Sequence, residues 1–150
     1  MRTILVDTGP LVALFNRQDN HHAAVKHWLR DFDGQLVSCW AVLTEVCHLV
    51  PEHLIAPFLR WTAQGGVRVM EIPPSALGEL AQLAAKYDDR PMDLADASLV
   101  WLANHQGLRD ILTLDHKDFA VYRTADGWAL RIRSKTISLN WVCSPRPFDG

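Results

Sequence analysis

The chain has 150 residues, of which 49% are hydrophobic and 21% are charged, and its formal net charge is -2 at pH 7. This composition excludes a disordered or collagen-like chain, and the length suits one domain with its own hydrophobic core. The slight negative charge argues against purely electrostatic nucleic-acid binding, although it leaves room for a local basic surface. Three cysteines favour a reducing compartment over a disulfide framework, and no apolar run is long enough to span a membrane. We therefore expect a single cytoplasmic domain over residues 1–150, without membrane association.

Strand and helix patterns alternate along the chain. Residues 3–7 form a short apolar run that ends at an Asp and a Thr-Gly-Pro turn, which predicts a buried strand. Residues 10–15 predict a helix, because Pro10 suits a first helical turn. The same criteria predict strands over 35–39, 67–72 and 110–114, and helices over 21–32, 41–50, 54–64 (which Pro57 should bend or delay), 75–87 and 91–106.

This alternation predicts right-handed βαβ units, with a parallel sheet covered by helices on both faces. The end of the chain has a different pattern. Residues 119–123 and 128–133 flank a Thr-Ala-Asp-Gly hairpin signal and predict two late edge strands. Residues 136–150 give no clear signal. The expected fold class is therefore α/β, with a central, mainly parallel sheet and a late edge hairpin.

Four acidic residues occur where their neighbours are predicted to be buried: Asp7, Glu45, Asp96 and Asp115. Asp7 and Asp115 end predicted strands, and open α/β sheets bind ligands at the carboxyl ends of their strands. A buried carboxylate must be protonated, paired or bound to metal, and the segments around these four contain almost no Lys or Arg. Asp93 adds a like charge three residues before Asp96 on one helix face. The helix N-terminus offsets only about 0.3–1 kcal/mol of this cost.

A divalent cation would remove the conflict. Hard oxygen ligands without Cys or His partners select Mg²⁺ or Mn²⁺ over zinc, and such an ion serves phosphate chemistry. Each acid alone also has an ordinary structural explanation: Asp7 as a turn or N-cap residue, Asp96 as a first-turn helix residue, Asp115 as a cap. Glu45 is hardest to explain in this way, because it lies mid-helix between apolar neighbours. Together the four indicate an acidic metal site.

The stretches that carry these acids resemble, in the same order, those of PIN-domain ribonucleases, specifically the toxin of bacterial VapB–VapC toxin–antitoxin modules. The matching stretches are 4–15, 42–50, 93–103 and 111–123. The resemblance implies a three-layer α/β/α fold and Mg²⁺- or Mn²⁺-dependent hydrolysis of RNA phosphodiesters. It also implies a homodimer and a cognate antitoxin whose peptide covers the acidic cleft. By position, the resemblance makes catalytic metal ligands of Asp7, Glu45, Asp96 and Asp115, with Asp93 as an additional candidate ligand.

Several other residues are candidates for supporting roles. Thr8 and Thr113 can hydrogen-bond a carboxylate or a phosphate, or they can simply satisfy the backbone at strand ends. Family members often carry an acid two residues after the fourth Asp, but here that residue is Lys117, which leaves the outer metal ligand open. Asp118 is a candidate to support the ligands from behind. Candidate contacts to RNA phosphates are Lys117, Arg123, Arg131 and Arg133, the alternative being a solvated edge-strand face.

Two other functions fit the same residues. One is a PIN nuclease of RNA maturation or decay that has no antitoxin, and the other is a non-catalytic binding module that keeps the fold. The number of metal ions, one or two, also stays open. A Gly-rich phosphate-binding loop is absent from the sequence, which disfavours nucleotide binding.

Overall fold

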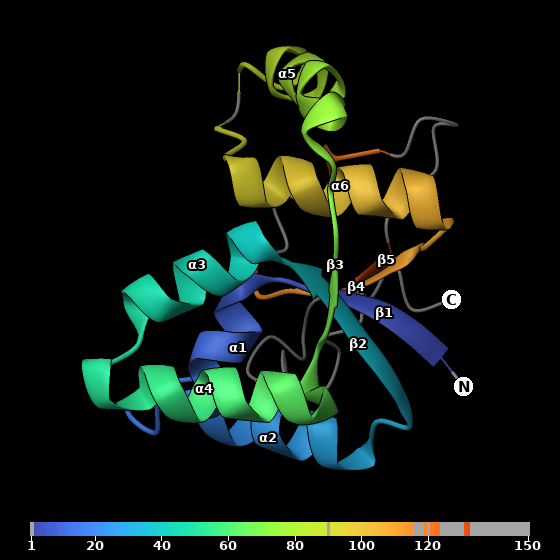
Figure 1. Ribbon diagram of the computed structural model, residues 1–150. Helices are drawn as coiled ribbons and strands as arrows, with labels where there is room; N and C mark the ends of the chain where they lie inside the picture. The colour runs from blue at the N-terminus through green and yellow to red at the C-terminus, as the bar shows by residue number, and fades with distance from the viewer. Residues whose placement is uncertain (1, 90, 116–118, 120, 124–130, 133–150) are drawn as a thin grey trace.

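The structure, a computed structural model, describes residues 2–89, 91–115, 119, 121–123 and 131–132. Within these residues five strands form one sheet in the order β3-β2-β1-β4-β5, and every neighbouring pair is parallel. The strands are β1 (Arg2–Val6), β2 (Gly34–Cys39), β3 (Arg68–Met70), β4 (Asp110–Leu112) and β5 (Arg131–Ile132). The expected α/β class with a central parallel sheet is confirmed (Figure 1).

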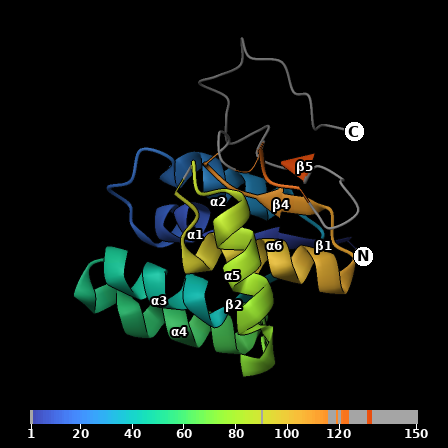
Figure 2. The ribbon, with the colours of Figure 1, turned by 90° about the horizontal axis from the view of Figure 1, so that it is seen from above.

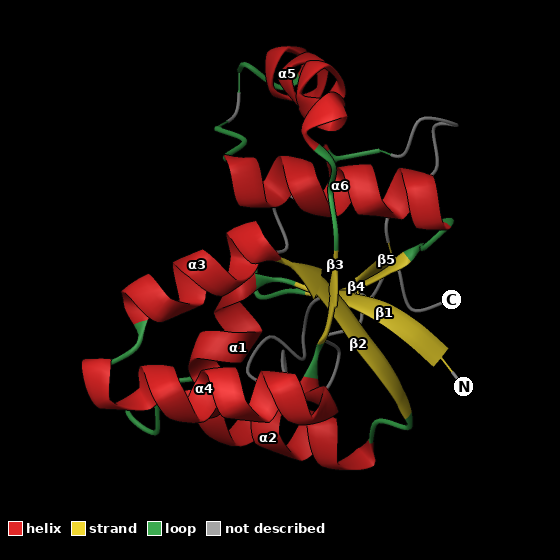
Figure 3. Ribbon diagram, viewed as in Figure 1, coloured by secondary structure: helices red, strands yellow, loops and turns green. Residues whose placement is uncertain are grey.

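Helices cover both faces of this sheet. They are α1 (Thr8–Phe15), α2 (His22–Asp31), α3 (Trp40–Leu49), α4 (Ile55–Trp61), α5 (Leu77–Lys86) and α6 (Leu94–Gln106), with the short turns η1 (Glu52–Leu54), η2 (Thr62–Gly66) and η3 (Pro74–Ala76). α5 and α6 lie on one side and α1, α2 and α4 on the other (Figure 3), while α3 contacts both α1 and α6. From above, α5 runs across α6 (Figure 2). The arrangement is a three-layer α/β/α fold; no helix in the described ranges is long and apolar enough to cross a membrane.

Capping residues set the helix boundaries that sequence periodicity missed by a few residues. α1 begins at Thr8, before the predicted start at Pro10, because Asp7 caps its N-terminus. α6 begins at Leu94, after the predicted start at residue 91, because Asp93 is its N-cap. Pro57 lies in the first turn of α4, where its missing N–H has no intrahelical partner to lose, and η1 precedes that helix.

The centre of the sheet is apolar on both faces. Ile4, Leu5 and Val6 in β1 are fully buried, as expected for a parallel strand between two helical layers. α6 is buried nearly all round, since it lies between the sheet and α5, and it ends at Gly107, whose φ of 65° is left-handed. This burial holds β1 and α6, the elements that flank the site, in fixed positions.

The register of β1 and β4 aligns the residues that follow them. Val6 pairs with Leu112, and the Asp7 N–H donates to the Leu112 carbonyl at 3.0 Å. Thr113 therefore follows β4 at the same edge where Asp7 follows β1. Since β2 is parallel to β1, α3 also starts at this edge.

The late hairpin is only partly as predicted. The strand expected over 119–123 is wrong: Phe119 and Val121 are helical, and the fully buried Phe119 ring packs edge-on against Tyr122, with ring centroids 5.1 Å apart. Burial of the aromatic side chains outweighs the strand propensity of this stretch. β5 does form an edge strand within 128–133, but it pairs parallel to β4. The expected turn at 124–127 and the tail 136–150 lie outside the described residues.

Gly34, the first residue of β2, offers a test of this packing. A Cβ at Gly34 would collide with the Arg2 carbonyl oxygen of the paired strand and lie 2.6 Å from Cζ of Phe32. We expect Gly34→Ala to lower the free energy of unfolding by about 1–3 kcal/mol in urea denaturation. Gly78→Ala in α5 is the matched control, because nothing lies within 4 Å of its Cβ; it should leave stability unchanged or raise it by up to about 1 kcal/mol. Equal effects of the two changes would contradict the β1–β2 register.

Candidate active site

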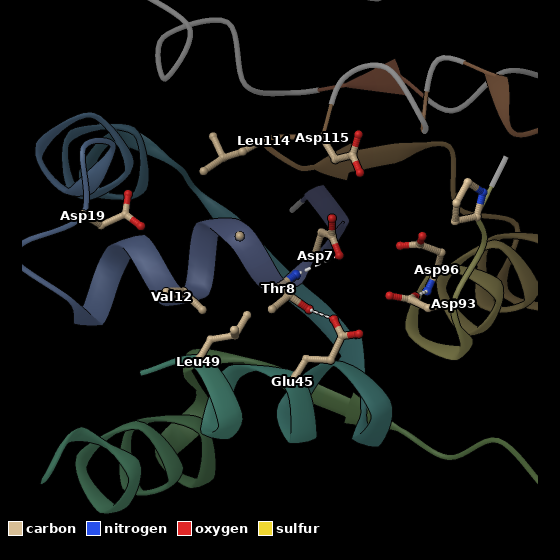
Figure 4. Close-up of a pocket in the computed structure, with 12 residues that line it drawn as sticks. Asp7, Thr8, Val12, Asp19, Glu45, Leu49, Asp93, Asp96, Leu114 and Asp115 are labelled. Atoms are coloured by element: carbon tan, nitrogen blue, oxygen red, sulfur yellow. Dashed lines mark hydrogen bonds between the residues drawn. The ribbon is translucent and has the colours of Figure 1, made fainter. Parts of the chain in front are cut away.

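A pocket of about 670 Å³ opens at the carboxyl end of β1 and β4 (Figure 4). It brings together all five acidic residues that were predicted as metal ligands, from four separate segments. It also includes Asp19, which the sequence analysis did not identify. The acidic residues that line it are Asp7, Asp19, Glu45, Asp93, Asp96 and Asp115.

Asp7 caps helix α1 and also lines the pocket. Its Oδ1 accepts a hydrogen bond from the Thr8 N–H at 2.8 Å, which caps α1. Its Oδ2 accepts from the Thr113 hydroxyl at 2.9 Å, and the same hydroxyl oxygen accepts from the Asp115 N–H at 2.9 Å. The N-cap explanation for Asp7 is therefore confirmed, Asp7 also lines the pocket, and Thr113 links the ends of β1 and β4.

Glu45 is held in a similar way from α3. The Thr8 hydroxyl donates to Glu45 Oε1 at 2.7 Å, so the first residue of α1 contacts two of the predicted acids. Thr8 and Thr113, named from the sequence as hydroxyls near the strand ends, thus each donate to a carboxylate.

Asp93 and Asp96 enter the pocket from the start of α6. Asp93 Oδ1 accepts from the Asp96 N–H at 2.8 Å as the helix cap. Asp96 Oδ2 accepts from the Tyr122 hydroxyl at 3.3 Å, and Tyr122 is fully buried. The sequence analysis did not single out Tyr122, although it lies within the last stretch that carried the family resemblance.

Burial and nearby like charges raise the pKa values of two acids in this pocket, Asp7 and Glu45. Burial raises the pKa of Asp7 from 3.8 to about 6; the hydrogen bonds from Thr8 and Thr113 oppose the shift, and the charges of Asp115 and Glu45 add to it. The pKa of Glu45 is also raised, first by burial and then by the neighbouring Asp93 carboxyl. The folded chain therefore holds these carboxylates together against mutual repulsion.

The donor set fits a hard divalent cation. All of its charged groups are carboxylates, and none of the described residues that line the pocket is Lys, Arg or His. Carboxylate oxygens are the ligands that Mg²⁺ and Mn²⁺ prefer, and a cation would favour the charged forms that burial and, to a smaller extent, like charge disfavour. Within the described ranges, no three His, Cys, Asp or Glu side chains form a ready set of metal ligands. The structure thus shows a shared acidic pocket without a closed coordination sphere.

Of the basic residues predicted to meet RNA, the structure describes the side chain of Arg123 alone, and Arg123 is not among the described residues that line this pocket. The Arg123 guanidinium donates to the Val121 and Tyr122 carbonyl oxygens at 2.9 and 3.0 Å, and its backbone N–H donates to the Tyr87 hydroxyl. The side chain of Arg131 and all of Lys117, Asp118 and Arg133 lie outside the described residues.

The raised pKa of Asp7 makes a prediction for stability. The unfolded chain loses this proton near pH 3.8 and the folded chain near pH 6, so the contribution of Asp7 to stability should fall by about 3 kcal/mol in total as the pH rises through and past these values. Asp7→Asn keeps an oxygen to cap α1 and removes the charge. We expect its free energy of unfolding, relative to that of wild type, to be about 2–3 kcal/mol higher (a more stable fold) at pH 7 than at pH 4, measured by urea denaturation in EDTA.

Asp33→Asn is the matched control, because Asp33 is exposed and precedes β2 at the opposite edge of the sheet. It should follow the wild-type pH profile. If the free energies of unfolding of wild type and Asp7→Asn differ by the same amount from pH 4 to pH 7, folding does not raise the pKa of Asp7.

Comparison with known proteins places this geometry in a family. Residues 4–125 match the PIN domain family. Over 128 residues the chain is 30% identical to Ribonuclease VapC26 of Mycobacterium tuberculosis (strain ATCC 25618 / H37Rv), a match that covers 83% of this chain and 95% of that protein. The fold is similar to the crystal structure of Mycobacterium tuberculosis VapC20, described as a Sarcin-Ricin loop cleaving toxin. That match has a TM-score of 0.70 at 19% identity and covers 76% of this chain and 91% of that one. With the family match spanning most of its length and VapC26 similar over nearly its whole sequence, this chain belongs to the PIN-domain family, among its VapC-type ribonucleases.

Proposed function

We propose that the chain is a Mg²⁺- or Mn²⁺-dependent endoribonuclease that hydrolyses RNA phosphodiester bonds, and that it is the toxin of a VapB–VapC-type pair. The observation that carries the proposal is the meeting of five carboxylates, from β1, α3, α6 and β4, in one pocket where burial and like charge raise two of their pKa values. The similarity to a named ribonuclease, VapC26, supports RNA as the substrate.

Asp7, Glu45, Asp96 and Asp115 would hold the metal, with Asp93 as a further ligand. A bound divalent cation would lower the pKa of water and neutralise negative charge on the phosphoryl oxygens. The hydroxyls of Thr8 and Thr113 orient Glu45 and Asp7, and Tyr122 orients Asp96. Asp7, with its pKa near 6, must lose its proton to act as a ligand, so metal binding and activity should weaken below that pH.

The proposed partners rest on the family resemblance. They are a cognate antitoxin whose peptide covers the acidic pocket, and a second copy of the chain in a homodimer. Lys117, Arg131 and Arg133 remain candidates to bind RNA phosphates, and the cytoplasm remains the proposed location. The expected products have 5′-phosphate and 3′-hydroxyl ends.

The central test is Asp96→Asn. The change keeps the volume and removes one ligand charge, so we expect RNA cleavage with Mg²⁺ or Mn²⁺ to fall by at least about 100-fold. In wild type, Mn²⁺ at 100 times its dissociation constant should add about 2.7 kcal/mol of stability and raise Tm by roughly 5–10 °C. Asp96→Asn should lose most of this rise.

Asp33→Asn is again the control and should keep both activity and the rise in Tm. Unchanged turnover in Asp96→Asn would remove Asp96 from the site. If Mn²⁺ does not stabilise the wild-type protein and no RNA is cleaved, the non-catalytic binding module becomes the better explanation.

The toxin role is tested in cells. Induced expression of the wild-type chain should arrest growth, because a free endoribonuclease depletes RNA, and Asp96→Asn at equal protein level should not. Co-expression of the product of a small neighbouring gene that encodes a DNA-binding protein should relieve the arrest. Normal growth with RNA cleavage retained in vitro would favour a nuclease of RNA maturation or decay.

A further inference from the structure

The pocket extends beyond its acid cluster into a region of different chemistry. Past Asp7 and Glu45 its lining becomes apolar, with Val12, Leu49 and Leu114. In Figure 4 these three side chains lie between the acid cluster and Asp19, which stands at the opposite end from Asp93 and Asp96. The metal chemistry proposed above uses only the acidic end.

Helical periodicity joins the two regions. Val12 lies four residues after Thr8 on α1, and Leu49 lies four residues after Glu45 on α3, so each helix presents a polar residue to the acid cluster and an apolar one a turn further along. Leu49 is 62% exposed, which is unusual for a leucine beside a charged site. The side chains of Val12 on α1 and Leu49 on α3, together with Leu114, form an apolar wall that suits a flat aromatic ring.

Asp19 closes the far end with a fixed hydrogen-bond acceptor. Its Oδ1 accepts from the His21 N–H at 2.8 Å and lies 3.6 Å from His21 Nδ1. The loop that carries it is held by backbone hydrogen bonds from the Asp19 N–H to Asn16 and from the His22 N–H to Asp19. The Asp19 side chain is 27% exposed, and among the described residues no hydrogen bond reaches its Oδ2. A ligand in the apolar region would therefore meet an oriented carboxylate.

We propose that this region binds the base of an unpaired guanosine in the RNA substrate, and that Asp19 determines base specificity. The proposal rests on the proposed function, since it takes the RNA phosphate to lie at the acid cluster. The base packs on Val12, Leu49 and Leu114, and the Asp19 carboxylate accepts hydrogen bonds from guanine N1–H and N2–H. The base must be unpaired, because pairing would occupy that edge; single-stranded loops present their bases in this way.

The chemistry of the four bases selects guanine. A carboxylate can only accept hydrogen bonds, and the pairing edge of guanine has two adjacent donors. Adenine and cytosine place one donor beside an acceptor, and uracil places one donor between two carbonyl oxygens. Each of these three would turn an acceptor toward Asp19, which costs binding free energy since an acceptor facing a carboxylate is unpaired and repelled.

The test is base preference at the cleavage site. Wild type and Asp19→Asn, each with Mn²⁺, would cleave a pool of unstructured RNA of random sequence, and sequencing of the ends would give the base frequencies beside the cut. We expect guanine at one flanking position in wild type, and a loss of that preference by about 10- to 100-fold in Asp19→Asn, because the amide offers one donor and one acceptor. The variant retains an oxygen for the His21 N–H and should keep the wild-type Tm; Asp33→Asn should keep the guanine preference.

A change in the substrate provides a second measurement that needs no variant to fold. Inosine lacks the N2 amino group, so replacing the preferred guanosine by inosine should slow wild-type cleavage about 10-fold, as kcat/KM, and should have little effect on Asp19→Asn.

The outcomes separate this inference from the proposed function. Metal-dependent cleavage without a guanine preference, or with a preference unchanged in Asp19→Asn, overturns the role of Asp19 and leaves the ribonuclease intact. Equal wild-type rates for guanosine and inosine overturn it as well. If wild type cleaves no RNA, both proposals fail.

Discussion

The parallel pairing of β1 with β2 on one side and β4 on the other determines where the acidic side chains meet. Strands that run in one direction release the chain at one edge, so the residues after β1 and β4 and the start of α3 come together there. Burial of Ile4, Leu5 and Val6 between two helical layers fixes this alignment. Apolar burial at the centre of the sheet therefore supports the charged pocket at its end.

The free-energy cost of placing carboxylates in this pocket is clearest at Asp7. Burial and the nearby carboxylates disfavour its charged form, while the α1 cap and the Thr113 hydroxyl partly compensate. Asp93 likewise caps α6 while it lines the pocket. Asp7 and Asp93 thus each start a helix and line the pocket, so the acids of the proposed site also have a structural role. A cation in the pocket would favour the charged forms that the apo fold disfavours.

The pocket combines two chemistries in one volume. Its acidic end fits phosphate hydrolysis, and its apolar end with Asp19 fits the selection of a base. The spacing of four residues on α1 and α3 places both chemistries on the same two helices, so in the proposed function one rigid frame would position the scissile phosphate and the neighbouring base.

A charge within an apolar run is visible locally, and for that reason the sequence alone singled out Asp7, Glu45, Asp96 and Asp115, together with the order of strands and helices as far as β4. Tertiary structure decided the rest. Asp19 lies in a polar loop where an acid is unremarkable, and it lines the pocket only because the fold packs α1 against both α2 and α3. The helical conformation of Phe119 and Val121, the Tyr122 contact to Asp96 and the parallel pairing of β5 also depend on segments distant in the chain. Local patterns report whether a side chain is out of place among its neighbours, but they cannot report which remote side chains it will meet.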